Sequence, residues 1–333
     1  MDGMLILTKS VMAMMIGFIL AVLLGIIIIP VLKRLHAGQT ISKWLARTHK
    51  NKQGTPTMGG LIFIIPPVLV MFILILMGKA EFNYTLGIIL FTFIGYFIIG
   101  FIDDFLIIKR HNNKGLTKTQ KFSMQVVVAI IFFYLFMKGE NEPLLWVHCL
   151  HFKMNIGWLY GVFILFVLVA SSNAVNLTDG LDGLAGGLSV IAFLTFGIIS
   201  WNTDWLLGYS EISLFAFILV GSLMGFLIFN TNKAKVFMGD TGSLCLGATL
   251  GAYAIMTRHE LLLVLIGIVF VIETLSCMIQ IVFFKLTGKR VFPMTPIHHS
   301  FEKIGMKEAD IVKMFWTVGL IAAMLALVYG VWL

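Results

Sequence analysis

The chain has 333 residues, of which 59% are hydrophobic and only 12% are charged. Soluble domains carry about 25% charged residues, so this composition excludes an ordinary soluble protein and indicates a polytopic membrane protein. The formal net charge is +8 at pH 7, and the 3 cysteines are too few and too scattered for a disulfide framework or a metal cluster.

Apolar runs long enough to span a bilayer recur along the whole chain. One transmembrane helix needs about 20 apolar residues. The sequence predicts ten such helices, over residues 11–32, 58–77, 84–102, 122–137, 157–173, 184–200, 211–229, 242–256, 261–284 and 311–332. We therefore expect an all-α polytopic membrane protein with a single domain over residues 1–333, and with both termini on the same side of the membrane.

The loops between these helices differ in charge. Lys and Arg gather in loops that follow odd-numbered helices, near residues 33–57, 103–121, 230–241 and 285–310. An excess of Lys and Arg marks cytoplasmic loops. We therefore expect these loops in the cytoplasm and both termini outside it. The positive face would meet anionic lipids or anionic substrates, and we expect no nucleic-acid partner.

Unusual polar residues lie in these loops and in the loop over residues 174–183, which also follows an odd-numbered helix and is expected on the same side. "HKNKQGTPTMGG" brings Lys52 close to the start of a predicted helix, where the helix N-terminus favours anions. "GFIDDF" places Asp103 and Asp104 at the end of an apolar run, although an ionised Asp at the bilayer centre costs roughly 2.5–3.5 kcal/mol. Neighbours on a helix point about 100° apart, so one carboxylate can face a metal and the other a substrate. The alternative is a solvated helix end.

The next two motifs are rich in glycine. "NLTDGLDGLAGG" contains Asp179 and Asp182, and "VFMGDTGSL" contains Asp240 between glycines. Glycine lets the backbone approach a ligand closely, and irregular backbone at membrane depth is tolerated where it lines a cavity. Asp240 can cap the following helix, reach a metal or lie against a phosphate. Phe237 is either a core aromatic or a stacking platform for a base.

The last predicted cytoplasmic loop contains "PIHHSFE", with His298 and His299. Paired histidines can bind a transition metal, act in acid–base chemistry or donate to phosphate. Zinc would need further nitrogen or sulfur ligands, so phosphate contact is the better interpretation. Carboxylates and lysines on one face suit Mg²⁺ and phosphates, because Mg²⁺ neutralises charge on a transferring phosphoryl group. The residues therefore predict Mg²⁺-dependent phosphoryl transfer at a membrane surface, with a lipid substrate.

These motifs resemble those of the phospho-N-acetylmuramoyl-pentapeptide-transferase family, in the polyprenyl-phosphate N-acetylhexosamine-1-phosphate transferase superfamily. The matching stretches, in the family's order, are "GTPTMGG" (54–60), "GFIDDF" (100–105), "NLTDGLDGLAGG" (176–187), "VFMGDTGSL" (236–244) and "PIHHSFE" (296–302). The resemblance covers essentially the whole chain. It implies transfer of phospho-N-acetylmuramoyl-pentapeptide from UDP-MurNAc-pentapeptide to undecaprenyl phosphate, which gives lipid I and UMP in peptidoglycan synthesis. It also implies Mg²⁺, a homodimer and an active site on the cytoplasmic face of the inner membrane.

The resemblance further implies roles for single residues. Asp103, Asp104 and Asp240 would be the catalytic carboxylates, with Asp240 as the metal ligand and Asp103 as the base that deprotonates undecaprenyl phosphate. In a second mechanism Asp240 is a nucleophile that forms a covalent phospho-sugar intermediate. His298 would join the catalytic residues. The residues implied in substrate binding are Lys52, Lys121, Asn176, Asp179, Asp182, Asn230, Phe237, Gln280 and His299.

Two positions depart from the family pattern. Ser300 stands where a third consecutive His is usual, and a Ser carries no charge near neutral pH. We therefore place the role on His298 and His299. In "FNTNKAKVFMGD" the triplet Asn-Lys-Ala replaces the usual His-Pro-Ala, which changes the stiffness of this loop but leaves Asn230 and Asp240 in place.

Three other functions compete with this interpretation. A related enzyme would use UDP-N-acetylglucosamine as the donor to a polyprenyl phosphate, and "GTPTMGG" and "PIHHSFE" argue against it. A secondary transporter would use the carboxylates to couple ions, but transporters keep such groups near the midplane in paired repeats, whereas here the acids lie at predicted helix ends. A scaffolding protein gives no reason for charged, glycine-rich motifs on one face.

Overall fold

The computed structural model describes residues 2–35, 52, 54–110, 115–147, 152–201 and 208–331. Lys43, Arg47, Lys50 and Lys114, which contribute to the predicted cytoplasmic charge, lie outside these residues. The helices are α1 (Asp2–Arg34), α2 (Gly60–Leu76), α3 (Tyr84–Arg110), α4 (Lys118–Lys138), α5 (Leu159–Thr178), α6 (Leu184–Trp201), α7 (Tyr209–Asn230), α8 (Gly239–Met256), α9 (Leu262–Ile266), α10 (Ile268–Thr287), α11 (Ile297–Ile304) and α12 (Glu308–Val331). Strands β1 (Leu144–Val147) and β2 (Phe152–Asn155) form an antiparallel hairpin.

The all-α membrane class is confirmed. Eight of the described helices are long and apolar enough to cross a membrane, namely α1, α3, α4, α5, α6, α7, α10 and α12. Helix α2 is apolar but has 17 residues, and α8 has 18 residues with a glycine-rich sequence. A helix therefore occupies each predicted position, while the number of spans and the side on which the termini lie stay predictions.

The structure differs from the predicted elements in several places. The helix expected over residues 84–102 continues to Arg110, so Asp103 and Asp104 lie within α3 and not in a loop after it. The helix expected over residues 261–284 is divided at Gly267, whose φ of −97° and ψ of 24° separate α9 from α10. An apolar run cannot reveal one residue that leaves the helical conformation. The hairpin and α11 lie in segments expected as loops, because strands of 4 residues and a helix of 8 residues are too short for a periodic signal.

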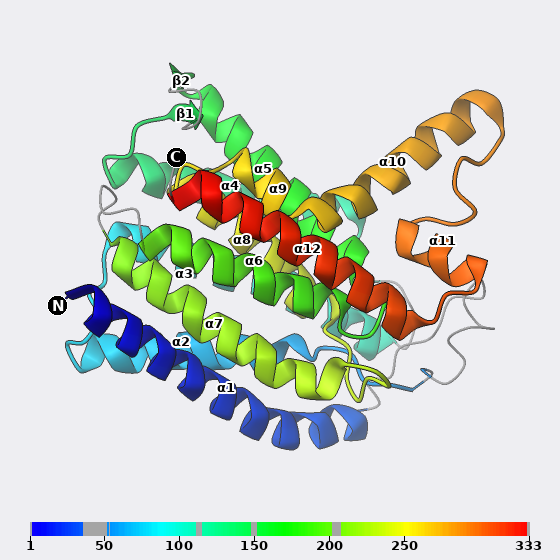
Figure 1. Cartoon of the computed structure of the whole chain (residues 1–333), viewed down its shortest axis with the longest axis horizontal. Coiled ribbons are helices and arrows are strands. Elements are labelled where there is room, and N and C mark those ends of the chain that lie inside the picture. The colour runs from blue at the N-terminus through cyan, green and yellow to red at the C-terminus, as the bar shows by residue number, and fades with distance from the viewer. Residues whose placement is uncertain are drawn as a thin grey trace.

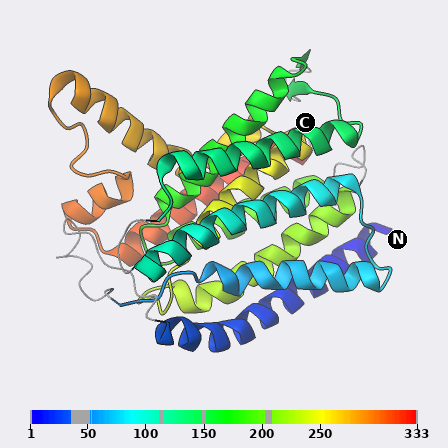
Figure 2. The same ribbon diagram turned by 180° about the vertical axis from the view of Figure 1, so that it is seen from behind.

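The helices form a bundle whose two ends differ. Both chain termini and the β1–β2 hairpin lie at one end, whereas α11 lies at the other (Figure 1). The view from behind shows the same arrangement and shows that the C-terminal half of α10 projects away from the bundle (Figure 2). Side chains on this projecting part are exposed, as at Phe284 with 50% and Leu286 with 79% exposure.

Helix α8 lies at the centre of the bundle. Every residue from Thr241 to Met256 is buried, and α8 packs against α3 and α5. Glycines permit this close packing. A Cβ at Gly242 would lie 2.7 Å from the Phe63 ring, and a Cβ at Gly251 would lie 2.7 Å from the Ser171 hydroxyl. These contacts hold α8 tightly against Phe63 of α2 and Ser171 of α5.

Candidate active site

Asp104 lies in α3 and caps the N-terminus of α8. Its Oδ2 accepts hydrogen bonds from the Thr241 main-chain N–H at 2.9 Å and from the Thr241 hydroxyl at 2.6 Å, and its Oδ1 accepts from the Asp240 N–H at 3.3 Å. Residue Met238, at the N-cap position of α8, provides no side-chain cap. A negative charge stabilises the positive end of a helix dipole. The capping role that the sequence suggested for Asp240 therefore belongs to Asp104.

Asp240 is held by side chains from two other helices. Its Oδ2 accepts a short hydrogen bond from Lys121 of α4, and its Oδ1 accepts one from the Asn176 amide of α5 at 2.6 Å. Asn176 also donates to the Ser243 hydroxyl at 2.8 Å. The Asp240 side chain retains 23% exposure, so a ligand at the end of the bundle can reach it.

Asp103 lies beside the same lysine. The Lys121 ammonium is 3.7 Å from Asp103 Oδ2, so this one cation lies between Asp103 and Asp240. Asp103 Oδ1 accepts a hydrogen bond from the Leu116 N–H at 2.7 Å. A Cβ at Gly115 would lie 2.6 Å from the same oxygen, so the segment before α4 closes over Asp103 only because this residue has no side chain.

A second network joins Lys52 to the turn between α5 and α6. Lys52 Nζ lies 2.7 Å from Asp182 Oδ1 and 2.5 Å from Glu308 Oε1. The same Glu308 oxygen accepts from the Asp182 N–H at 2.6 Å, and Asp182 Oδ2 accepts from the Ala234 N–H at 2.9 Å. Burial acts to lower the pKa of Lys52, but Glu308 and Asp182 together raise it by more, so this pKa lies above its ordinary value. Glu308 was not predicted, because nothing near it in the sequence distinguishes it from other acids at helix starts.

Asp179 lies in the turn that follows α5. Burial raises its pKa to about 7, and the negative charges of Asp240, Asp104 and Asp182 act in the same direction, opposed by Lys52. Burial is the largest of these effects, and the neighbouring carboxylates add to it.

The donor set is compatible with one Mg²⁺ ion, which would complete its coordination with oxygens from a substrate or water. Among the described residues, no group of three or more His, Cys, Asp or Glu is arranged to hold a metal ion. Mg²⁺ needs no such cage, since it usually takes one or two carboxylates and completes its shell with water and phosphate oxygens. Among these carboxylates Asp240 suits this role best, because its side chain is 23% exposed, whereas Asp104 is 4% exposed and bonds to α8.

His298 reaches the same region from α11. Its ring is completely buried, and its Nδ1 lies 3.0 Å from Glu273 Oε2 of α10. Its Nε2 faces Gly180 so closely that any side chain there would overlap the ring. Gly180 follows Asp179, so His298 contacts the turn that carries this carboxyl group. Glu273 was also not predicted, although a lone acid within an apolar helix is itself a signal of a functional position.

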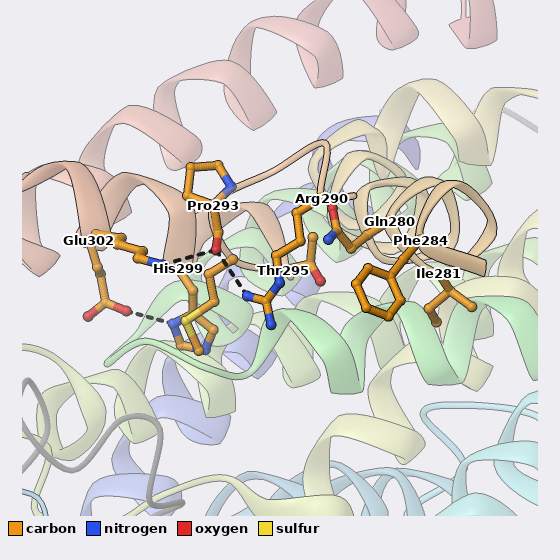
Figure 3. Close-up of a pocket in the computed structure, with 10 residues that line it drawn as sticks. Gln280, Ile281, Phe284, Arg290, Pro293, Thr295, His299 and Glu302 are labelled. Atoms are coloured by element: carbon orange, nitrogen blue, oxygen red, sulfur yellow. Dashed lines mark hydrogen bonds and ion pairs between the residues drawn. The ribbon is translucent and has the colours of Figure 1, made fainter. Parts of the chain in front are cut away.

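His299 and Gln280 line a pocket beside His298, and the His299 ring packs edge-on against the His298 ring with centroids 4.1 Å apart. This pocket of about 530 Å³ lies between α10 and α11, and it is also lined by Ile281, Phe284, Arg290, Pro293, Met294, Thr295, Glu302 and Lys303 (Figure 3). His299 Nδ1 is 2.6 Å from Glu302 Oε2. Gln280 Oε1 accepts hydrogen bonds from the main-chain N–H groups of Val291 and Phe292 at 3.1 and 2.9 Å. The side-chain oxygen of Gln280 therefore supports the segment that leads to α11.

The last two predicted residues connect loops. Asn230 is 3% exposed; its Oδ1 accepts from the Gly183 N–H at 3.1 Å, and its Nδ2 donates to the Val236 carbonyl at 2.9 Å. The Phe237 N–H donates to the Pro56 carbonyl at 2.8 Å, and its own carbonyl accepts from the Gly59 N–H at 2.8 Å. The motifs at residues 54–60 and 236–244 are thus neighbours, and the Phe237 ring remains partly exposed.

Known proteins resemble this chain along nearly its whole length. Residues 86–258 match the family model described as glycosyl transferase family 4, and residues 52–64 match phospho-N-acetylmuramoyl-pentapeptide-transferase signature 1. The phospho-N-acetylmuramoyl-pentapeptide-transferase of Geobacillus thermodenitrificans is 44% identical over 97% of this chain and 98% of its own. The enzymes of that name from Oceanobacillus iheyensis and Bacillus subtilis are 43% and 42% identical, each over 96% of this chain and 97% of its own.

Proposed function

The chain belongs to the phospho-N-acetylmuramoyl-pentapeptide-transferases within glycosyl transferase family 4, and from this premise we propose the reaction that it performs. It transfers phospho-N-acetylmuramoyl-pentapeptide from UDP-MurNAc-pentapeptide to undecaprenyl phosphate, which yields lipid I and UMP. One observation carries the proposal: Lys121 lies between Asp103 and Asp240 at the end of a membrane bundle. This arrangement supports phosphoryl transfer to a lipid at the membrane surface.

The carboxylates would have different roles. Asp103 accepts the proton of undecaprenyl phosphate, whose oxygen then attacks the phosphorus that bears the sugar. A new P–O–P bond forms, and UMP leaves with the electron pair of the broken bond. Mg²⁺, held by Asp240, would supply positive charge to the diphosphate. In the alternative mechanism Asp240 is the nucleophile, and in both mechanisms Lys121 and Asn176 orient its carboxylate.

The two substrates would approach from different sides. The turn with Asp179 and Asp182, together with Lys52, Asn176 and the partly exposed Phe237 ring, would receive the nucleotide. The pocket in Figure 3 combines apolar Ile281 and Phe284 with basic Arg290 and Lys303. Because undecaprenyl phosphate is an apolar chain with an anionic head, the exposed side of α10 beside this pocket is the proposed path of the lipid.

We further propose that the site faces the cytoplasm from the inner membrane. Basic residues in the last turns of α1, α3 and α10 support this orientation, namely Lys33, Arg34, Lys109, Arg110 and Lys285. These turns lie at the end of the bundle opposite the termini (Figure 1), and excess Lys and Arg marks the cytoplasmic side. A homodimer is proposed from the family resemblance alone, and light scattering of the purified protein tests it.

UMP release by the purified full-length protein in detergent tests the reaction. The assay would contain UDP-MurNAc-pentapeptide and undecaprenyl phosphate, with and without Mg²⁺, and UDP-N-acetylglucosamine as the alternative donor. We expect release with the muramoyl donor only, and only when lipid and Mg²⁺ are present. Release with the other donor alone would overturn the substrate but keep the reaction class. A folded protein that releases UMP with neither donor would refute the proposal.

A further inference from the structure

Glu273 and His298 form a buried pair between α10 and α11. Both residues are 0% exposed. Glu273 Oε2 lies 3.0 Å from His298 Nδ1 and also accepts a hydrogen bond from the His298 main-chain N–H at 3.4 Å. One carboxylate oxygen therefore contacts both the ring and the backbone of the same histidine, which fixes the position of the ring and of the first turn of α11.

The backbone contact indicates which atom carries the proton. A main-chain N–H can only donate, so Oε2 is an acceptor in that hydrogen bond. The simplest arrangement that satisfies both contacts has an ionised Glu273 and a proton on Nδ1. In a neutral ring, Nε2 then carries the lone pair, and in a protonated ring it carries a second N–H. In either form the contact with Glu273 keeps a proton on Nδ1, so Nε2 is the ring atom that remains to contact a ligand.

The Nε2 atom is the free end of this pair. It is buried without a hydrogen-bond partner among the described residues, as is Glu273 Oε1. A buried polar atom without a partner is costly, so its retention points to a partner that arrives with a ligand. Nε2 faces Gly180, in the turn that also carries Asp179 and Asp182. The unpaired atom is thus directed at the candidate active site.

We propose that Glu273 is a positioning residue for His298: it fixes the proton on Nδ1 and presents Nε2 to a phosphate group of the bound substrate. This inference rests on the proposed transferase function. With one proton held on Nδ1, a ring that also carries an N–H at Nε2 can donate from it to a phosphate oxygen. Carboxylates orient metal-bound histidines in the same way, and their loss costs about 10- to 100-fold in activity.

Nitrogen NMR of the ligand-free protein in nanodiscs tests the first part without any assay of activity. Histidine rings would be labelled with heavy nitrogen, and the His298 signals would be assigned by their absence in His298→Gln. We expect a protonated Nδ1 in the wild type, and a shift of the proton toward Nε2 in Glu273→Leu. A bare Nδ1 in the wild type, or an unchanged ring in Glu273→Leu, would overturn the proposal. This result is independent of UMP release. Absence of UMP release would refute the proposed transferase function but not the protonation of His298 by way of Glu273.

A double-mutant cycle tests the second part. Glu273→Leu should lower kcat about 10- to 100-fold, and it should cause no further loss, within about a factor of two, in a His298→Gln background. Glu273→Gln, which keeps an acceptor oxygen but no charge, should lie between Glu273→Leu and the wild type. Equal losses of kcat from Glu273→Leu in both backgrounds would mean that Glu273 acts independently of His298, which would contradict the proposal.

Ser276→Ala is the matched control for this cycle. Ser276 is 3% exposed and lies one turn along α10 from Glu273, where its hydroxyl donates to the Glu273 main-chain carbonyl at 2.7 Å. The control removes a buried polar group from the same helix but leaves the His298 contact intact. It should therefore preserve both the protonation of His298 and kcat within about twofold. A loss as large as that of Glu273→Leu would assign the effect to the packing of α10.

Discussion

The main-chain oxygen of Asp240 lies so close to Gly100 that no side chain fits between them. A Cβ at Gly100 would overlap this oxygen, and it would also lie 2.8 Å from the Thr241 Cα. Gly100 is one turn from Asp103 and Asp104 in α3, and Asp240 begins α8. The spacing of the two helices, and with it the distances among the three carboxylates, is therefore set by a glycine.

Gly100→Ala should disturb the site although it adds a single methyl group. The contacted atoms belong to the backbone of α8, so they cannot rotate away, and the helices must separate. We expect a loss of about 1–3 kcal/mol of stability and a loss of about 100-fold in UMP release, because a displacement of about 1 Å can have this effect. Thermal unfolding in detergent and the UMP assay measure the two quantities.

Gly87→Ala in the same helix is the control for Gly100→Ala. Its Cβ would meet only the Phe82 ring, at 3.4 Å. Alanine has a higher helix propensity than glycine, so this variant should be neutral or more stable by up to about 1 kcal/mol. If both variants behave alike, the close approach of α3 and α8 does not control the site.

Asp104→Asn and Asp240→Asn should separate capping from chemistry. In Asp104→Asn an amide NH₂ replaces one acceptor of the Thr241 and Asp240 hydrogen bonds, and the negative charge at the α8 dipole is lost. We expect a loss of about 1–2 kcal/mol in stability together with most of the activity. Asp240→Asn should lose at least about 100-fold in activity at nearly unchanged thermal stability, because its carboxylate is partly exposed.

Either variant can contradict these assignments. An active Asp240→Asn enzyme would exclude Asp240 both as the metal ligand and as the nucleophile. An Asp104→Asn protein that unfolds at the wild-type temperature would show that the carboxylate does not stabilise the N-terminus of α8. The comparison is informative because the two residues share a hydrogen bond at 3.3 Å but differ in their surroundings.

The pKa of Asp179 predicts a pH dependence of stability. Burial and the neighbouring carboxylates raise it from 3.8 to about 7, so the folded protein holds a proton that the unfolded chain releases. The contribution of Asp179 to stability should then fall as the pH rises from about 4 to about 7, and it should be constant above that range. Asp179→Asn lacks this titration, so the wild type should lose stability relative to the variant across this window. Thermal unfolding of both ligand-free proteins checks this, and parallel curves would contradict it.

The sequence predicts the helices of this fold well because each spanning helix is a local, continuous apolar run. It also predicts that Asp103, Asp104 and Asp240 lie on one side, since each follows or precedes an apolar run, although α3 continues to Arg110 and contains both Asp103 and Asp104. It does not predict which carboxylate is a cap. Asp104 bonds to Thr241, a residue 137 positions away, so only the packing of α3 against α8 reveals the role.

The same reason explains the acids that were not predicted. Glu308 contacts Lys52 across 256 positions, and Glu273 contacts His298 across 25 positions. Neither contact leaves a spacing pattern in the sequence. The different polar partners of the two adjacent histidines are also beyond sequence analysis: their rings pack edge-on with centroids 4.1 Å apart, but His298 contacts Glu273 of α10 whereas His299 contacts Glu302 of α11.

Ser300 offers a test of the position where the family usually has a third histidine. Its hydroxyl donates a short hydrogen bond to the Met294 carbonyl and accepts one from the Met294 N–H at 3.2 Å. Ser300 is 5% exposed, so the hydroxyl connects α11 to the segment before it. Ser300→Ala should cost about 1 kcal/mol of stability and should reduce activity only a few-fold, because the catalytic groups remain.

Ser300→His should not improve the enzyme. The larger ring cannot occupy the space of a hydroxyl beside Met294, so it must displace the segment that lines the pocket in Figure 3. We expect lower thermal stability and no gain in kcat, measured as UMP release over a range of pH. An increase in kcat that follows the titration of the new ring would show that this position contributes proton chemistry after all. The role would then extend beyond His298 and His299.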